Sequence, residues 1–490
     1  MQRLRDNSHI IKLLIIIVSG LFFWIARLPS LFEPYYYGDE MIYLSIGNGI
    51  RQGLSLYTEL YDNKTPLLYL VAAISGNLFV FRLLSGVCMF LSVFFIFGIV
   101  RNLTKKGSVL PFYSLAISTV LLSLPIFEVF IANAENFFIL PTSAAIYFLT
   151  RYLVSKKQTN LFFAGLGLGI AFLFKVPTIA DFFATVGILS ALASLNFNGI
   201  KKLILQSLIV FLGLITPITL TIIWFFFNNN LFDFLSYALF DNLGYSTSWS
   251  GGESTAFQLT TLSLVFAFSV FVLWFLRKSG KVNELFVLST LWLLGTLTGA
   301  LLSSRPYPHY LIQTLPALSI VTTILFFSSK KQQVYTVFVV AIYLFFIQKI
   351  DFWLYDIKTY KERVVALATY SKSNDQYLSL FGPDVVQNYE AAKIIKESTA
   401  FGQEVFIFGD SAPIYAMSNR LPPFKYTAYY HVDEFLNQDE ICATIKNKKT
   451  PLILIDKQRG ADCLKTLSTR YYVLNHTTDK YEFWFLATKE

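Results

Sequence analysis

Residues 203–227, LILQSLIVFLGLITPITLTIIWFFF, run without a single charged side chain. A helix of about 20 apolar residues is long enough to cross the roughly 30 Å hydrocarbon layer of a membrane. Stretches of the same kind recur on both sides of this one, so the sequence predicts an α-helical polytopic membrane protein. We expect about eleven transmembrane helices, near residues 10–28, 79–100, 109–126, 136–153, 160–175, 177–195, 203–227, 257–276, 284–303, 309–328 and 333–350.

The overall composition agrees with a membrane protein. The chain has 490 residues, of which 54% are hydrophobic and 14% are charged, whereas about 25% of the residues in a soluble globular protein are charged. This composition excludes a disordered protein, a collagen and a disulfide-dense secreted scaffold.

Basic residues are concentrated in every second connection between the apolar stretches. They are Arg3, Arg5, Lys12, Arg101, Lys105, Lys106, Arg151, Lys156, Lys157, Lys201, Lys202, Arg277, Lys278, Lys281, Lys330 and Lys331. Because Lys and Arg favour the cytoplasmic side, we expect a multi-pass cell-membrane protein with its N-terminus in the cytoplasm and its C-terminal part outside. The excess of basic residues behind the formal charge of +9 then lies mostly on cytoplasmic loops that face anionic lipid. Nucleic acid is therefore not an expected partner. The short apolar segment 66–78 fits this alternation only as an interfacial or re-entrant helix.

The composition changes near residue 351, so we expect a transmembrane domain at 1–350 and a small extracytoplasmic α/β domain at 351–490. Residues 385–398 have helical apolar spacing, and apolar runs at 404–409 and 451–455 predict buried strands. Residues 470–487 predict a β-hairpin that turns around 475–479. Cys442 and Cys463 both lie in this domain, but sequence spacing alone leaves open whether they form a disulfide.

The long first outer loop carries the polar residues that best fit a catalytic role. It includes Asp39, Glu40, Asp62 and Lys64, with a helix expected over 41–52. A carboxylate beside a membrane can act as general base toward a hydroxyl, and a lysine can balance a phosphate. The alternative is a solvated loop without a catalytic role.

The loop also resembles that of a known family. GDE at 38–40 followed by YDNKTPLLY at 61–69 is similar to the first outer loop of C-type membrane glycosyltransferases. The resemblance is to the protein O-mannosyltransferase and lipid A aminoarabinose transferase group, which includes RgtA/B/C/D-like transferases. Here Thr65 replaces the first proline of the family pattern. GLGLGIAFLFKVP at 165–177, RPYPHY at 305–310 and FIFGDSAPIYAMSNRLPP at 406–423 are similar to further segments of the same group.

The resemblance implies a C-type glycosyltransferase fold and catalytic loop, placed here at 29–66. It further implies transfer of a hexosyl or pentosyl group from a polyprenyl-phosphate donor, usually with inversion, on the outer face of a bacterial membrane. The acceptor would be an envelope lipid, a glycan or a protein. By its match to the family's Asp-Glu pair, Asp39 is expected to be the base and Glu40 its orienting partner. The sequence itself shows no clear cage of carboxylates or histidines, so no metal or other cofactor is implied.

The leaving phosphate needs preorganised positive charge. The residues that we expect to bind it are Lys64, Arg305, His309, Tyr310 and Arg82. Each has a structural alternative: a snorkelling arginine, a hydrogen-bonded histidine, or a tyrosine of the aromatic belt.

Further residues are candidate substrate contacts, namely Asp62, Glu135, Lys175 and Tyr245. Ionisable residues near or within spans are functional candidates by default, although Glu135 could be a solvated loop acid. Asp181, one turn into the expected span at 177–195, is a candidate ion-pair partner for Lys175.

Two other functions fit the membrane topology. One is a transporter or lipid flippase without glycosyl transfer, for which paired repeats and broken midplane helices would be typical; we find no internal duplication. The other is a noncatalytic scaffold whose outer domain binds a partner.

Overall fold

The computed structural model describes residues 2–241, 253–302, 305–370, 374–459 and 462–487. The chain divides into two compact units. The first contains Met1–Ser30, Arg82–Asn229 and Leu239–Ile357, and the second contains Leu31–Phe81, Asn230–Ala238 and Lys358–Glu490.

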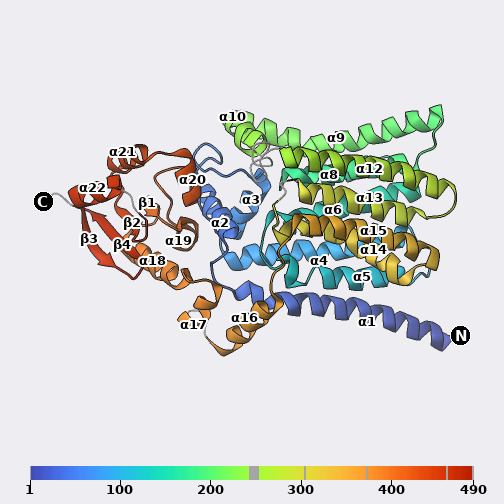
Figure 1. Cartoon of the computed structure of the whole chain (residues 1–490), viewed down its shortest axis with the longest axis horizontal. Helices are drawn as coiled ribbons and strands as arrows, with labels where there is room; N and C mark the ends of the chain where they lie inside the picture. The colour runs from blue at the N-terminus through green and yellow to red at the C-terminus, as the bar shows by residue number, and fades with distance from the viewer. Residues whose placement is uncertain (1, 242–252, 303–304, 371–373, 460–461, 488–490) are drawn as a thin grey trace. The chain divides into compact units, whose positions relative to one another are not determined.

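Long helices make up most of the first unit (Figure 1). They are α1 (Gln2–Arg27), α4 (Leu78–Asn102, which begins in the second unit), α5 (Leu110–Leu121), α6 (Ala134–Ser155), α7 (Thr159–Phe172), α8 (Ile179–Leu192), α9 (Phe197–Phe227), α12 (Glu253–Lys278), α13 (Glu284–Leu301), α14 (Leu315–Phe327) and α15 (Lys330–Ile350). Short 3-10 turns connect some of them: η1 (Leu28–Phe32), η2 (Pro125–Phe127), η3 (Val176–Thr178) and η5 (Pro308–Thr314).

Each of the eleven predicted apolar stretches coincides with a helix. Within the described residues, eight helices are long and apolar enough to cross a membrane by themselves. The other three, α5, α7 and α8 with η3, are shorter apolar helices. Large apolar side chains such as Phe227 on α9 and Phe268 on α12 remain exposed, as expected for helices that face lipid.

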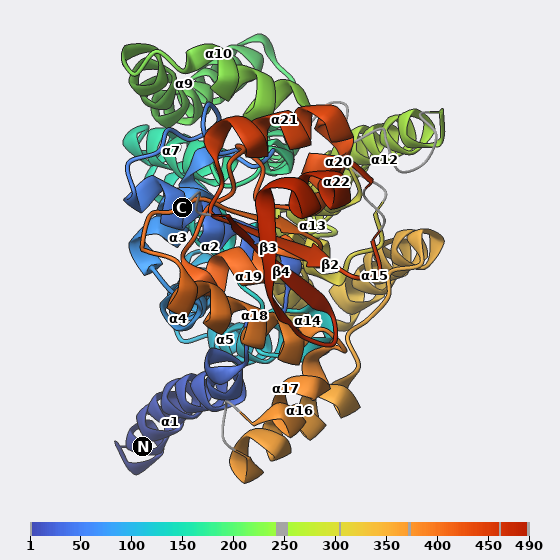
Figure 2. The same ribbon diagram turned by 90° about the vertical axis from the view of Figure 1, so that its left-hand side faces the viewer.

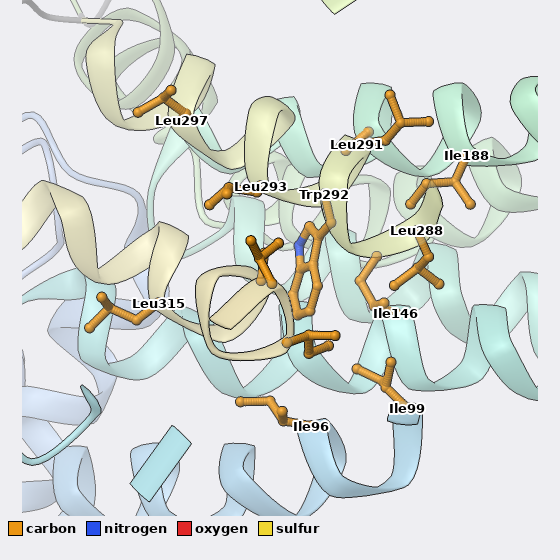
Figure 3. Close-up of a cluster of buried hydrophobic side chains, with 14 of the residues drawn as sticks. Ile96, Ile99, Ile146, Ile188, Leu288, Leu291, Trp292, Leu293, Leu297 and Leu315 are labelled. Atoms are coloured by element: carbon orange, nitrogen blue, oxygen red, sulfur yellow. The ribbon is translucent and has the colours of Figure 1, made fainter. Parts of the chain in front are cut away.

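Helix α13 forms the centre of the first unit. Its Trp292 is completely buried, among Ile96 of α4, Ile146 of α6 and Ile188 of α8 (Figure 3). A helix that is apolar on every side is stable only where other helices surround it, and α13 fulfils that condition.

The glycine-rich segment at 165–177 has a packing role. A Cβ atom at Gly165 of α7 would lie 2.0 Å from the carbonyl oxygen of Val210 on α9. On another side of α7, a Cβ atom at Gly167 would lie 2.7 Å from the carbonyl oxygen of Pro141 on α6. Only glycine permits these backbones to approach so closely.

The second unit combines the segment Leu31–Phe81 with the C-terminal part of the chain. Its helices and turns are α2 (Gly38–Arg51), α3 (Pro66–Ser75), α10 (Leu231–Asp233), η4 (Phe234–Phe240, a π-helical stretch), α16 (Ile357–Thr369), α17 (Asp375–Leu378), η6 (Ser379–Phe381), α18 (Val385–Ser398), α19 (Ser411–Ser418), α20 (Tyr429–Phe435), α21 (Gln438–Lys448) and α22 (Asp462–Tyr471). The predicted helices 41–52 and 385–398 correspond to α2 and α18. Within this unit, the backbone N–H of Tyr61 donates to the carbonyl of Lys425 at 2.8 Å, which ties the loop to the C-terminal part.

A four-stranded sheet with the order β1-β2-β4-β3 forms the core of the C-terminal part (Figure 2). Strands β1 (Val405–Phe408) and β2 (Leu452–Asp456) are parallel, and β4 (Tyr481–Leu486) is antiparallel to both β2 and β3 (Tyr472–Thr477). The two predicted strands and the predicted hairpin are therefore confirmed. Cys442 and Cys463 form a disulfide, with their Cα atoms 6.4 Å apart.

Candidate active site

The Asp-Glu pair lies in the first turn of α2, which begins at Gly38, three residues before the start of the helix predicted at 41–52. Negative charge is favoured at this end of a helix by the helix dipole. Glu40 is completely buried, whereas Asp39 is half-buried. No hydrogen bond joins the Asp39 carboxylate to the described part of the chain, so its oxygens are available to a substrate.

Asp62 and Lys64 belong to a closely bonded turn before α3. The buried Asp62 accepts hydrogen bonds from the Tyr69 hydroxyl at 2.7 Å and from the backbone N–H of Asn63 at 2.9 Å. The backbone N–H of Lys64 donates to the Tyr69 hydroxyl oxygen at 3.1 Å, and its Nζ donates to Oδ1 of Asn63 at 2.8 Å. The turn thus fixes the base of Lys64 while its side chain stays partly accessible.

Tyr57 also stabilises the turn that contains Asp62 and Lys64. Its hydroxyl donates to the carbonyl of Lys64 at 2.8 Å. The backbone of Tyr57 has φ 74°, a conformation that is unfavourable for a large side chain and that persists only where the surroundings enforce it. Burial, and secondly the Asp62 carboxylate, raise the pKa of Tyr57 well above its usual value, so the hydroxyl remains a donor.

The side chain of Tyr61 joins the turn to the C-terminal part of the second unit. Its ring packs against Tyr426, His431 and Phe435, with centroid separations of 5.2, 5.0 and 5.2 Å. Burial lowers the pKa of His431; the Asp62 carboxylate opposes this shift, and the positive charge of Lys64 adds a smaller lowering. His431 is therefore favoured in its neutral form.

A second group of polar residues lies at helix ends in the first unit. Glu128 and His309 are both buried, with Oε2 and Nδ1 3.0 Å apart. Glu135, in the first turn of α6, forms an ion pair with Lys175, which follows the end of α7. The Lys175 ammonium also lies 3.9 Å from the centre of the Tyr310 ring, a favourable cation–π geometry.

The expected pairing of Asp181 with Lys175 is wrong. The Asp181 carboxylate instead accepts hydrogen bonds from Nε1 of Trp292 and Nε2 of Gln313, both at 2.9 Å. Because Gln313 belongs to η5, this contact fixes the segment that carries His309 and Tyr310 against α8 and α13. The carboxylate therefore acts as a structural anchor within the helix bundle.

The remaining predicted residues have different surroundings. Arg82 is completely buried, and its Nη1 donates to the carbonyl of Ser30 at 2.6 Å. Arg305 is half-buried in the segment before η5. Tyr245 lies outside the described residues.

Sequence reasoning did not single out Asn133, Tyr57 or Tyr69. Asn133 lies between Glu128 and Glu135, is 1% exposed, and has neither side-chain atom bonded to the described part of the chain. A buried amide without partners calls for an explanation such as a bound water or ligand. Its position between two acids in the sequence was the one available signal. Tyr69 closes the family-like stretch YDNKTPLLY, which was the available signal for it, whereas nothing in the sequence set Tyr57 apart from the other tyrosines, of which the chain has 28 in all.

A search for metal ligands among the described residues finds no group of three His, Cys, Asp or Glu side chains that could hold an ion.

Known proteins include a family and solved structures to which this chain is similar. Residues 65–225 match the family model described as dolichyl-phosphate-mannose-protein mannosyltransferase. The fold is similar to that of ArnT from Cupriavidus metallidurans bound to undecaprenyl phosphate, with TM-score 0.57 and 12% identity over 96% of this chain and 97% of that one. The archaeal oligosaccharyltransferase AglB from Archaeoglobus fulgidus, in complex with an inhibitory peptide and a dolichol-phosphate, matches with TM-score 0.39 and 13% identity over 95% of this chain and 74% of that chain. No curated protein matches the chain in sequence.

The family match and the likeness to ArnT confirm the resemblance to the C-type glycosyltransferase group of protein mannosyltransferases and ArnT. They also confirm a polytopic helical fold with a small C-terminal α/β part. At 12% identity, the likeness to ArnT concerns the fold alone.

Proposed function

We propose that this chain, which has the C-type glycosyltransferase fold, is a membrane glycosyltransferase. It transfers a hexosyl or pentosyl group from a polyprenyl-phosphate donor to an envelope lipid, glycan or protein. The match of residues 65–225 to the mannosyltransferase family supports the reaction class. The undecaprenyl phosphate bound to ArnT supports a lipid-linked donor.

In the proposed mechanism Asp39 is the general base. A half-buried carboxylate with no hydrogen bond to the described chain can accept the proton of an acceptor hydroxyl as the hydroxyl oxygen attacks the anomeric carbon. The bond from that carbon to the phosphate oxygen breaks, and the electron pair leaves with the phosphate. Attack opposite the leaving group inverts the anomeric centre. Glu40, buried in the same helical turn, orients Asp39.

Lys64 is the proposed stabiliser of the leaving phosphate. Its backbone is fixed by Tyr57 and Tyr69 while its ammonium stays partly accessible, which is the preorganisation that stabilisation of developing charge requires. Arg305, His309, Tyr310 and Arg82 are further residues proposed to bind the phosphate, the two arginines by their positive charge and His309 and Tyr310 by the likeness of 305–310 to the family segment. Asp62, Glu135 and Lys175 are proposed substrate contacts because ionisable residues near or within spans are functional candidates by default, and the Tyr245 ring is proposed to stack on a sugar.

The proposed location is a cell membrane, with the N-terminus in the cytoplasm. The catalytic loop 29–66 and residues 351–490 lie on the outer face, and residues 1–350 otherwise form the membrane part. The disulfide between Cys442 and Cys463 supports this orientation, because such bonds persist in oxidising compartments.

The test is transfer by the purified full-length chain in liposomes that contain its native membrane acceptors. Polyprenyl-phosphate mannose and polyprenyl-phosphate arabinose, each labelled in the sugar, separate hexosyl from pentosyl transfer. We expect one of them to yield labelled acceptor and free polyprenyl phosphate. Replacing the proposed base, in Asp39→Asn, should lower the rate by about 10²- to 10⁴-fold.

Asp479→Asn is the matched control, because Asp479 is exposed in the hairpin turn between β3 and β4. It should retain the wild-type rate. Wild-type turnover by Asp39→Asn would refute the assigned base. Movement of labelled lipid across the bilayer without any sugar transfer would refute the enzyme and support a flippase.

A further inference from the structure

A cavity in the second unit has no role in the mechanism described above. Its volume is about 530 Å³, and it is lined by residues 52–60 of the loop after α2, by Gly402 and Glu404, by residues 421–425 and by Lys448. Two backbone hydrogen bonds join the walls: Tyr61 N–H to the Lys425 carbonyl at 2.8 Å, and Val405 N–H to the Leu421 carbonyl at 2.9 Å. The cavity is therefore bounded by well-anchored segments.

The charges in the cavity wall are balanced. Glu404 forms an ion pair with Lys448 at 2.8 Å. The Nζ of Lys425 donates to the Tyr237 hydroxyl at 2.8 Å, and Glu59 accepts from the Ser55 backbone N–H at 2.7 Å. Two acids and two lysines line the cavity, so it carries no excess positive charge to attract a phosphate.

The rest of the lining combines apolar surfaces with hydrogen-bonding groups. Leu421, Pro422, Pro423 and Phe424 form a continuous apolar segment, while Gln52 and Thr58 add neutral polar groups. A sugar ring has apolar C–H faces and a rim of hydroxyls that both donate and accept. Ring faces of this kind pack against aromatic and proline side chains, and hydroxyls pair with amides and carboxylates. An acyl chain would leave the polar groups unpaired.

Gln52 provides an independent observation. Its Nε2 is buried, and no residue in the described part of the chain accepts a hydrogen bond from it. An unpaired buried donor beside a cavity marks a position where an oxygen from solvent or ligand is expected.

We propose that this cavity binds a neutral saccharide unit of the acceptor. That the saccharide belongs to the acceptor rests on the proposed function. That the cavity binds a neutral saccharide follows from the lining of the cavity itself.

The first experiment is photo-crosslinking of the full-length chain in nanodiscs, with Phe424 replaced by p-benzoylphenylalanine. The probe is the neutral oligosaccharide fraction released from the source cell envelope by mild acid and labelled with 2-aminobenzamide. We expect labelled chain after irradiation, with labelling suppressed by excess unlabelled neutral fraction and unaffected by excess inorganic phosphate. The same replacement at Val473, which is exposed on β3, is the control and should give no labelling.

Labelling at position 424 no greater than at 473 would overturn the proposal. Suppression by phosphate as effective as suppression by saccharide would overturn it as well, because the cavity would then be an anion site. Crosslinking of position 424 to bilayer lipid alone would show a lipid surface instead.

The second experiment uses Gln52→Leu. This substitution removes the unpaired amide at similar volume, so the unfolding temperature should not fall while the affinity for the neutral fraction drops about tenfold. Gln387→Leu is the matched control, because Gln387 also has an unpaired buried side-chain atom but does not line the cavity. Unchanged affinity in Gln52→Leu would contradict the assigned contact.

The two proposals can fail separately. Asp39→Asn should capture the labelled saccharide at position 424 although it does not transfer sugar. Capture by a wild-type chain that transfers neither sugar would leave the saccharide site standing and refute the enzyme. Transfer without any capture would leave the enzyme standing and refute the site.

Discussion

The two polar groups described above are held in different ways. In the second unit, Tyr57, Asp62, Lys64 and Tyr69 are bonded to one another within one short stretch of chain. In the first unit, Lys175 meets Glu135 and His309 meets Glu128, so each pair joins distant segments. The local group leaves a lysine partly accessible for chemistry, whereas in the distant group the charge of the buried Glu135 is matched by Lys175.

The comparison predicts the largest effect for Lys175→Met. Removal of the ammonium leaves the buried Glu135 carboxylate unpaired, which costs about 3–5 kcal/mol. Thermal unfolding of the full-length chain in detergent should show a large loss of stability and a low membrane yield. The double variant Lys175→Met/Glu135→Gln should recover much of that loss, because no unpaired charge remains.

Lys358→Met is the control for that prediction. Its partner is Glu362 at 4.0 Å, and both side chains are largely exposed, so the loss should stay below about 0.5 kcal/mol. Equal stability of Lys175→Met and Lys358→Met would show that the buried pair is unimportant for folding.

A smaller effect is expected in the local group, for Tyr69→Phe. The variant loses the hydroxyl that donates to Asp62 and accepts from the Lys64 backbone, at a cost of about 1–3 kcal/mol. Because Lys64 then loses its support, the rate of sugar transfer should fall about tenfold. Tyr113→Phe is the control, because the Tyr113 hydroxyl makes no hydrogen bond to the described part of the chain. This variant should change neither the stability nor the transfer rate. A variant Tyr69→Phe with the wild-type transfer rate would separate the turn from catalysis.

The smallest effect concerns pH and the second unit. Since burial lowers the pKa of His431 below its usual 6.5, the unfolded chain binds more protons than the folded chain as the pH falls below 6.5. Folding stability should therefore decrease with acidification, by at most about 1.4 kcal/mol per pH unit for one group.

Unfolding temperatures at pH 7.5 and 5.5 would measure this dependence. His431→Leu should reduce the difference between the two temperatures, and His476→Leu, at an exposed position on β3, should leave it unchanged. An identical difference in wild type and His431→Leu would exclude His431 as its source.

Local patterns in the sequence predicted the elements well. The apolar spacing over 385–398 became α18, and the runs around 406 and 453 became paired strands. Helical periodicity and strand burial depend on neighbouring residues, so one sequence is enough to read them. The disulfide could not be decided in this way, because spacing of 21 residues does not determine the separation of two Cα atoms.

The partners of buried charges were beyond the sequence for the same reason. Asp181 was expected to pair with Lys175 but is bonded to Trp292 and Gln313. Which groups meet inside a helix bundle depends on how the helices cross, and six residues of sequence separation carry no information about that. The unpaired amide of Asn133 likewise becomes visible only once burial is known.

The short helices of the first unit have a consequence for the surrounding bilayer. With 12 residues in α5 and 14 in α7, at 1.5 Å per residue, these helices rise about 18 and 21 Å. Both expose apolar side chains, for example Val120 and Phe163, and the rise is less than the usual hydrocarbon thickness of about 30 Å. Lipids beside such helices adapt by thinning. We therefore expect a locally compressed bilayer beside α5 and α7, where a lipid headgroup travels a shorter distance toward the membrane midplane.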